Sequence, residues 1–297
     1  MGTGDRAAKR RSGAVESAAG LRDNRPVART IEVAGELKRD ALGRVELLRD
    51  SESGERRVRR VAAGGGLPGS GLVARVLLRR EARALEALAG LPGAPAVERD
   101  PAWGAAPSLD GRRPAAAATL VRAYTPGAPL HRAEVLPRDF FELLEELVRA
   151  VHARGVCHND LHKEQNVVVA EDGRPWLIDF QLASLHPRRA RRFAVRCRDD
   201  LRHVHKHHRR YTRDGRGPEP RGPAGDREGA RLPRSGAAWI WRRTAKPLYN
   251  LFTRGVLRTR DGEERRDSSG PWPAWTAPVG PGERGTAPSP QRPGPEA

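Results

Sequence analysis

Alternating apolar and polar residues predict a small sheet near the start of the chain. Ile31–Lys38, Arg44–Leu48 and Arg56–Val61 alternate in this way, and the first two flank a turn that contains Gly43. Strand character returns within Ala115–Tyr124, after a Pro-rich stretch. We therefore expect three consecutive strands and a later one that follows a helix.

Apolar residues at helical spacing predict two well-formed helices and a third, more basic one. Leu72–Ala89 is closed by Gly90, and Phe140–Arg154 begins at an Asp139–Glu142 capping pattern and ends at Gly155. Asp200–Tyr211 is also expected to be helical.

One carboxylate lies within the apolar stripe of the first helix. Glu81 shares that stripe, whereas Glu86 lies on the Arg/Ala face. A carboxylate that points into a core needs a cationic partner, so Glu81 is a candidate for a buried ion pair. A partly exposed position at the edge of the stripe is the alternative.

The stretch from 155 to 181 holds three groups with a chemical reason to be close together. Asp160 precedes a hairpin whose turn is marked by Asp172-Gly173, and folding about that turn places Asn166 opposite Asp179, give or take one residue. Carboxylate and amide oxygens form a pocket suited to Mg²⁺. An ordinary surface hairpin is the alternative.

This stretch resembles the catalytic core of the protein-kinase-like superfamily. His158-Asn159-Asp160-Leu161 is similar to the H-R-D-L motif, and Asp179-Phe180-Gln181 is similar to D-F-G. The resemblance implies ATP and Mg²⁺ as cofactors, with Asp160 orienting the acceptor hydroxyl and Asn166 and Asp179 holding the metal. Lys163, or else His162, would contact the transferring phosphate.

Several residues of this chain differ from the usual protein-kinase motifs. The interval from Asp160 to Asn166 is one residue longer than in the usual motif, so Gln165 competes for the amide role. Asn159 replaces the Arg that binds an activation-loop phosphate, Gln181 replaces Gly, and no A-P-E segment follows. The pattern looks most like compact bacterial relatives of RIO-type and lipopolysaccharide-core sugar (Kdo/heptose) kinases.

In the N-terminal lobe that the resemblance implies, the third strand should carry a Lys, but none is present. Arg60 is the expected substitute, because it shares a strand face with Val58 while Arg59 faces the other way. Arg60 would pair with Glu81, and Gly43 alone marks the loop that would cover the nucleotide phosphates.

We therefore expect an α+β, two-lobed protein-kinase-like fold with a reduced activation segment. A small N-terminal β-sheet plus one helix would form the first lobe, and the second lobe would be mostly helical. The expected divisions are a disordered basic tail (1–30), the N-lobe (31–118), the C-lobe (119–257, with a mobile basic insert at 215–236) and a disordered Pro/Gly-rich tail (258–297).

The chain carries a formal net charge of +18, and much of it lies after the D-F-Q motif. Residues 186–234 hold 16 Lys/Arg against 6 Asp/Glu, which is +10 of the total. This segment is a candidate surface for an anionic partner, either RNA or a membrane, although a solvated basic surface explains it equally well. Within it, His203 and His207 have a spacing that suits a metal, and after it Trp239–Leu257 contains a short amphipathic pattern.

Other compositional features point to a reducing compartment. Cys157 and Cys197 are the two cysteines, and neither has metal-ligand spacing. The first 30 residues lack an apolar signal core. We expect a cytoplasmic monomer that is at most peripheral to the inner membrane.

The leading functional prediction is Mg-ATP-dependent transfer of the γ-phosphoryl group to a hydroxyl, in the manner of an atypical serine/threonine-type or sugar kinase. The acceptor would be a protein Ser/Thr or a lipid-linked sugar. The main alternative is a pseudokinase that serves as a nucleotide-binding scaffold, because Arg60 replaces the usual Lys. A basic RNA-binding protein is a third reading that rests on charge alone.

Overall fold

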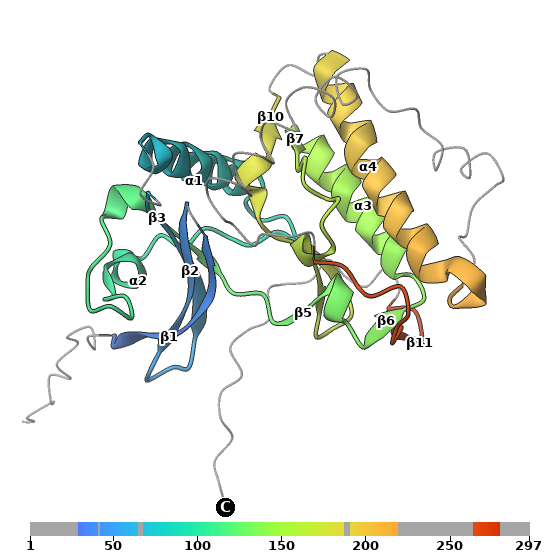
Figure 1. Cartoon of the computed structure of the whole chain (residues 1–297), viewed down its shortest axis with the longest axis horizontal. Helices are drawn as coiled ribbons and strands as arrows, with labels where there is room; N and C mark the ends of the chain where they lie inside the picture. The colour runs from blue at the N-terminus through green and yellow to red at the C-terminus, as the bar shows by residue number, and fades with distance from the viewer. Residues whose placement is uncertain (1–28, 41, 65–67, 187–190, 219–263, 280–297) are drawn as a thin grey trace, which may run out of the picture.

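The N-terminal part of the molecule is a four-stranded antiparallel sheet with one long helix packed against it (Figure 1). The computed structural model describes residues 29–40, 42–64, 68–186, 191–218 and 264–279. The sheet has the order β1-β2-β3-β4. Its strands are β1 (Ile31–Asp40), β2 (Gly43–Asp50), β3 (Arg56–Ala62) and β4 (Thr119–Ala123). Because β4 pairs with β3, this lobe extends past the expected boundary at residue 118.

Helix α1 (Ser70–Ala87) packs on the sheet and begins two residues earlier than its apolar pattern predicts. Its buried side chains are Ala74, Leu78, Glu81, Ala84 and Leu85. Glu81 thus points into the core, as its place in the apolar stripe predicts. A short helix, α2 (Pro101–Ala105), follows in the Pro-rich stretch, where Asp100 caps it by accepting a hydrogen bond from the Ala102 N–H.

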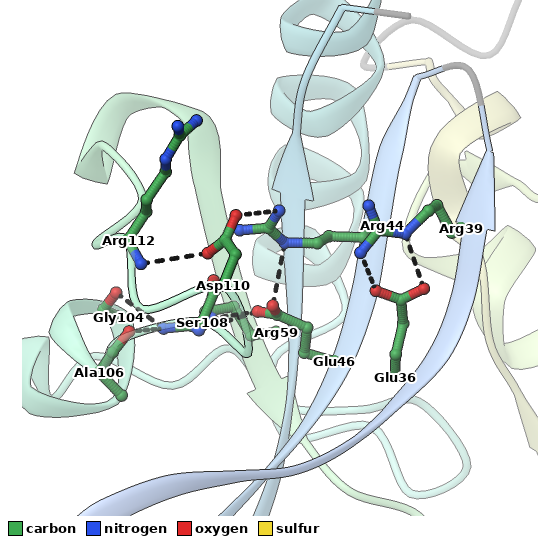
Figure 2. A network of polar contacts seen from close by, with 10 residues as sticks. All are labelled: Glu36, Arg39, Arg44, Glu46, Arg59, Gly104, Ala106, Ser108, Asp110 and Arg112. Atoms are coloured by element: carbon green, nitrogen blue, oxygen red, sulfur yellow. Dashed lines mark hydrogen bonds and ion pairs between the residues drawn. The ribbon is translucent and has the colours of Figure 1, made fainter.

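The other face of the sheet carries a buried ion pair. Arg59 and Glu46 are directly opposite each other on β3 and β2, both side chains are at most 1% exposed, and Arg59 Nη2 lies 2.8 Å from a Glu46 carboxylate oxygen. Arg59 also donates to the carbonyls of Gly104 and Ala106 and to Ser108, as Figure 2 shows. Arg59 therefore anchors the loop after α2 and faces away from Arg60, in agreement with strand alternation.

Two long helices form the framework of the second lobe and lie side by side (Figure 1). They are α3 (Phe140–Ala153) and α4 (Arg191–Thr212). Short strands precede α3, namely β5 (Gly127–Pro129) and β6 (Val135–Pro137), and others lie between α3 and α4 in sequence, namely β7 (Val156–Cys157), β8 (Val167–Ala170), β9 (Pro175–Leu177) and β10 (Ser184–Leu185). Short 3₁₀ helices also occur along the chain, at Ala116–Ala118, Leu130–Arg132, Glu164–Asn166, Phe180–Leu182 and Arg213–Gly215.

The hairpin of β8 and β9 is one residue out of the expected register. Val167 pairs with Leu177, and the carbonyl of Asn166 accepts a hydrogen bond from the Ile178 N–H, so Asn166 lies opposite Ile178 and not Asp179. The reason is the turn, which spans three residues between Ala170 and Arg174 and ends on Gly173 with φ of 80°. A Gly in this left-handed conformation closes a three-residue loop centred on Asp172, whereas the sequence pattern folds about the Asp172-Gly173 pair, give or take one residue.

The expectation of a structureless tail from residue 258 is wrong for residues 264–279. This C-terminal segment, shown in red in Figure 1, includes β11 (Ala274–Thr276), which pairs in parallel with β6. Trp272 and Trp275 pack against Tyr211 and Phe141. The segment also changes how α3 begins, because the Asp139 carboxylate accepts a hydrogen bond from the Val279 N–H and makes no cap within the helix.

The expected α+β fold is confirmed. The tail at 1–28, most of the insert at 215–236 and the amphipathic pattern at 239–257 lie outside the described residues. Residues 215–218 are described, and Arg216 lies over the Trp272 ring. None of the helices in the described ranges combines the length and apolar character needed to cross a membrane.

Candidate functional site

The loop between β7 and β8 places Asp160 between two basic side chains. Asp160 is 3% exposed, His162 Nδ1 lies 3.0 Å from its Oδ1, and Lys163 Nζ lies 3.4 Å from its Oδ2. Burial alone would raise the pKa of Asp160, but the His162 hydrogen bond and the Lys163 charge outweigh it and lower the pKa. Asp160 is therefore ionised at neutral pH.

Asn166 is fixed against Asp160 by its amide nitrogen. Nδ2 donates to the Asp160 backbone carbonyl at 3.0 Å and to Oδ2 at 2.9 Å. Because both bonds use the nitrogen, Oδ1 is turned away from Asp160. Gln165 faces elsewhere and accepts a hydrogen bond from the Glu264 N–H. Of the two candidate amides, Asn166 is the one beside Asp160.

Asp179 follows β9 in a left-handed backbone conformation with φ of 64°. Asp tolerates this conformation better than most residues, and it turns the chain out of the hairpin. Asp179 Oδ1 lies 3.1 Å from Arg60 Nη2. Burial opposes ionisation of Asp179, but the charges of Arg60, Lys38 and Lys163 outweigh it and lower the pKa. The field of neighbouring Asp160 acts in the opposite direction, so the two carboxylates are electrostatically coupled.

The expected ion pair between Arg60 and Glu81 is present. Arg60 Nε lies 2.9 Å from Glu81 Oε2, and Glu81 is 1% exposed. Arg122 on β4 lies 3.6 Å from the other oxygen of the same carboxylate. Burial raises the pKa of Glu81, and the two arginines work against that rise. Arg60 therefore links α1 to Asp179, and Arg122 is a second cation that the sequence did not single out.

A cleft lies under the β1–β2 turn, next to Arg60. Its lining includes Lys38, Gly43, Arg60 and Gln181, so it joins the sheet to the residue after Asp179-Phe180. Gly43 has φ of 143°, and a Cβ there would lie 2.0 Å from the Val61 carbonyl oxygen. A larger residue would push β2 away from β3, so Gly43 is required for close packing at the cleft wall. Lys38 was overlooked because β1 carries no motif.

Asp200 is another residue that sequence reasoning missed. It is 1% exposed on α4, and its carboxylate accepts hydrogen bonds from the backbone N–H groups of His158 (2.8 Å) and Asn159 (2.9 Å). His152 Nε2 lies 3.1 Å from Asp200 Oδ2. One buried carboxylate on a distant helix thus holds the start of the loop that carries Asp160. Its only sequence signal was an acidic residue in a basic helix.

Asn159 ties the same loop to the segment after D-F-Q. Its φ is 64°, and its Nδ2 donates to the Leu182 carbonyl at 2.8 Å and to Ser184 Oγ at 3.0 Å. Its Oδ1 accepts from Arg196 on α4 at 3.0 Å. Where the motif usually carries an Arg, this chain has an amide that connects the two segments directly.

Glu164 supports the loop from the side of the C-terminal segment. It is fully buried, and its Oε2 accepts hydrogen bonds from Tyr211 Oη (2.8 Å) and the Arg266 N–H (3.1 Å). Arg210 Nε lies 3.3 Å from its other oxygen. The C-terminal segment is therefore part of the scaffold beneath the site.

Comparison with known proteins finds a curated relative of this chain. A curated relative, the probable SapB synthase of Streptomyces coelicolor, is 34% identical over 162 residues. That alignment covers 48% of this chain and 16% of the length of the relative, so the chain spans a small part of that protein. The narrower resemblance to RIO-type and lipopolysaccharide-core sugar kinases is not confirmed.

The family comparison covers most of the chain. Residues 18–228 match the model of the phosphotransferase enzyme family APH. The match spans both lobes and includes Arg60, Glu81, Asp160, Asn166 and Asp179. The chain belongs to the APH phosphotransferase family, a branch of the protein-kinase-like superfamily.

Proposed function

We propose that the chain transfers the γ-phosphoryl group of Mg-ATP to a hydroxyl group. The observation that carries the proposal is the convergence of Asp160, Asn166 and Asp179 from a loop, a hairpin and the residue after it. Among the described residues, their contacts use Asn166 Nδ2 and Asp179 Oδ1, so Asn166 Oδ1 and Asp179 Oδ2 would be the oxygens that face a cation. An amide oxygen beside a carboxylate oxygen suits Mg²⁺, which favours hard oxygen ligands.

The proposed roles follow from charge and position. Asp160, ionised and held by His162, would orient the acceptor hydroxyl and take its proton. Lys163 would neutralise charge on the transferring phosphate, and Asn166 and Asp179 would hold the metal against the nucleotide. Most of the acceleration in such reactions comes from positioning and charge neutralisation, for which these groups are suited.

Lys38 and Arg60 would share the role that a strand-three Lys has in related enzymes. Arg60 is already paired with Glu81 and Asp179, so it chiefly holds α1 and Asp179 in place. Lys38 lines the same cleft, and its charge acts on Asp179. Together they would supply the cationic field for the α and β phosphates.

The acceptor is proposed by class. A protein Ser/Thr or a lipid-linked sugar carries the hydroxyl that the chemistry requires. The similarity to the probable SapB synthase does not identify the acceptor, because the alignment covers a small part of that protein. The exposed basic residues of α4 would favour an acceptor or partner that is anionic. They are Arg191, Arg192, Arg196, Arg198, Lys206 and Arg209.

The test is calorimetry of ATP binding with and without Mg²⁺, followed by turnover of labelled ATP with serine/threonine peptides and sugars. Wild type should bind Mg-ATP, and Asp179→Asn should lose the Mg²⁺ dependence. Asp160→Asn is the matched control, since it should keep binding and lose at least a hundredfold in transfer. Absence of nucleotide binding in wild type would sink the proposal.

A second candidate is a nucleotide-binding scaffold without transfer. It is favoured by one observation, the replacement of Lys by an Arg that is held by two carboxylates. It predicts Mg-ATP binding with equal, background ATP turnover in wild type and Asp160→Asn. Higher turnover in Arg60→Lys than in wild type would support an enzyme over a scaffold.

A further inference from the structure

The two cysteines of the chain, 40 residues apart in sequence, meet beside the catalytic loop. Cys157 ends β7 and is completely buried, and Cys197 lies on α4 with partial exposure. Their sulfurs are 3.7 Å apart. His152, in the last turn of α3, lies beside them, and the ligand atoms of the three residues are all within 4.8 Å of one another. Elements α3, β7 and α4 pack together at this point (Figure 1).

The spacing of the two sulfurs suits a tetrahedral cation. Two metal–sulfur bonds of about 2.3 Å at the tetrahedral angle place the sulfurs about 3.8 Å apart, close to the 3.7 Å between Cys157 and Cys197. Two thiolates and an imidazole form a soft-to-borderline ligand set of the type that selects Zn²⁺ over Mg²⁺ or Ca²⁺. The donors therefore differ from those of the oxygen-rich site around Asp160.

The histidine already has the kind of partner that metal-bound imidazoles have. Histidine ligands commonly give their second ring N–H to a carboxylate, which fixes the ring orientation. His152 Nε2 lies 3.1 Å from Asp200 Oδ2, and Asp200 is almost completely buried. The histidine pair on α4, His203 and His207, does not belong to this cluster. His207 Nε2 donates a hydrogen bond to the Leu161 carbonyl.

We propose that His152, Cys157 and Cys197 form a structural binding site for a thiophilic divalent cation of the Zn²⁺ class. Cys157 directly precedes His158, and Asp200 joins His152 to the backbone of His158 and Asn159. The ion would therefore brace the base of the catalytic loop against α3 and α4. This inference does not depend on which acceptor the enzyme uses.

The experiment uses the full chain, reduced with a phosphine, stripped with a chelator and titrated with Co²⁺ and then Zn²⁺. Wild type should take up one equivalent of Co²⁺ with a sulfur-to-cobalt charge-transfer band, and Zn²⁺ should displace it. Cys197→Ser should bind at least a hundredfold more weakly and lose most of the band. His152→Gln should weaken binding and keep the sulfur band.

The control is His203→Gln, which removes a histidine from the same helix outside the cluster. It should match wild type in stoichiometry and affinity. Circular dichroism shows whether each variant is folded. If Cys197→Ser unfolds, the test becomes whether Zn²⁺ protects both thiols of the wild type from alkylation. Unchanged binding in Cys197→Ser, or oxidation of both thiols to a disulfide in a wild type that takes up no metal, overturns the proposal.

Discussion

Asp200 accepts a hydrogen bond from the backbone N–H of His158 at 2.8 Å, across 42 positions of sequence. The same carboxylate accepts from Asn159, so two consecutive amides of the loop that carries Asp160 converge on one buried group. Loops held in this way have little freedom, because moving them leaves a buried carboxylate without its donors. The position of Asp160 therefore depends on a residue of α4.

Replacing this carboxylate should loosen the loop. Asp200→Asn leaves one acceptor for two N–H donors, so we expect the amides of His158 and Asn159 to exchange with solvent at least tenfold faster. The free energy of unfolding should fall by about 2 kcal/mol. Hydrogen exchange measured by mass spectrometry checks the first effect and urea unfolding the second. Asp199→Asn, at the neighbouring part-buried position, should change neither.

Arg60 compensates two buried carboxylates at once. Arg60→Met leaves Glu81 with the more distant Arg122 and Asp179 without its closest cation, so the free energy of unfolding should fall by about 3 kcal/mol. Arg60→Lys keeps the charge, so its free energy of unfolding should fall less than that of Arg60→Met. It should still fall, because one ammonium cannot bridge two carboxylates as a guanidinium does. Urea unfolding measures both.

The control for this pair is Arg79→Met, on the exposed side of α1. Its free energy of unfolding should lie within about 0.5 kcal/mol of the wild-type value. Equal stability of Arg60→Met and Arg79→Met would show that the ion pairs contribute nothing.

Lys38 should contribute to nucleotide binding without contributing to the core. It lines the cleft beside Arg60 and acts electrostatically on Asp179. We expect Lys38→Met to weaken Mg-ATP binding at least tenfold with an unchanged thermal midpoint, as measured by calorimetry and scanning calorimetry. Lys206→Met removes an equal charge from α4 and should leave the affinity unchanged. The same loss in both variants would mean a general charge effect.

The C-terminal segment should stabilise the second lobe through Arg266. This guanidinium is 8% exposed and donates to the carbonyls of Ala133 and Pro271. Arg266→Ala leaves those carbonyls without a donor and should lower the free energy of unfolding by about 2 kcal/mol. Glu264→Ala, in the same segment, removes an exposed ion pair with Arg132 and a contact with His131 and should cost less than about 1 kcal/mol. Thermal and urea unfolding would show the contrast.

His208 should make stability depend on pH. Burial lowers its pKa to about 4, with a further contribution from His205, and its ring stacks on Phe141 at 4.8 Å. As the pH falls below the ordinary His value of about 6.5, the unfolded chain takes up a proton that the folded chain refuses until about pH 4. Stability should therefore decline over that window, and His208→Phe should remove about 2 kcal/mol of the decline. Parallel pH profiles of the two proteins would contradict this assignment.

Local sequence was sufficient for much of the site. Periodicity of 3.6 placed Glu81 on the buried stripe of α1, and strand alternation placed Arg60 and Arg59 on opposite faces of β3. The spacing of the loop brought Asn166 beside Asp160. These placements agree with the structure because each depends on the geometry of one element or on one short loop.

Other features could be decided only by residues far apart in the chain. Asp139 has the signature of a helix cap, yet its carboxylate binds the Val279 N–H, because the C-terminal segment offers a donor at that point. The register of β8 and β9 follows a three-residue turn that closes on Gly173, which shifts the pairing by one residue from folding about Asp172-Gly173. A turn signal identifies where a chain reverses more reliably than how many residues it uses.

The sequence by itself indicated the candidate groups: the Glu81, Asp160 and Asp179 carboxylates, the Asn166 amide and the Arg60 cation. The tertiary structure alone decided what holds those groups in place. Asp200, the Cys157–Cys197 pair and the C-terminal segment act across tens of residues, and a residue's burial and partners depend on the packing of the whole chain. Local sequence patterns cannot predict those contacts, because hydrogen bonds and ion pairs between elements form only after the elements have packed together.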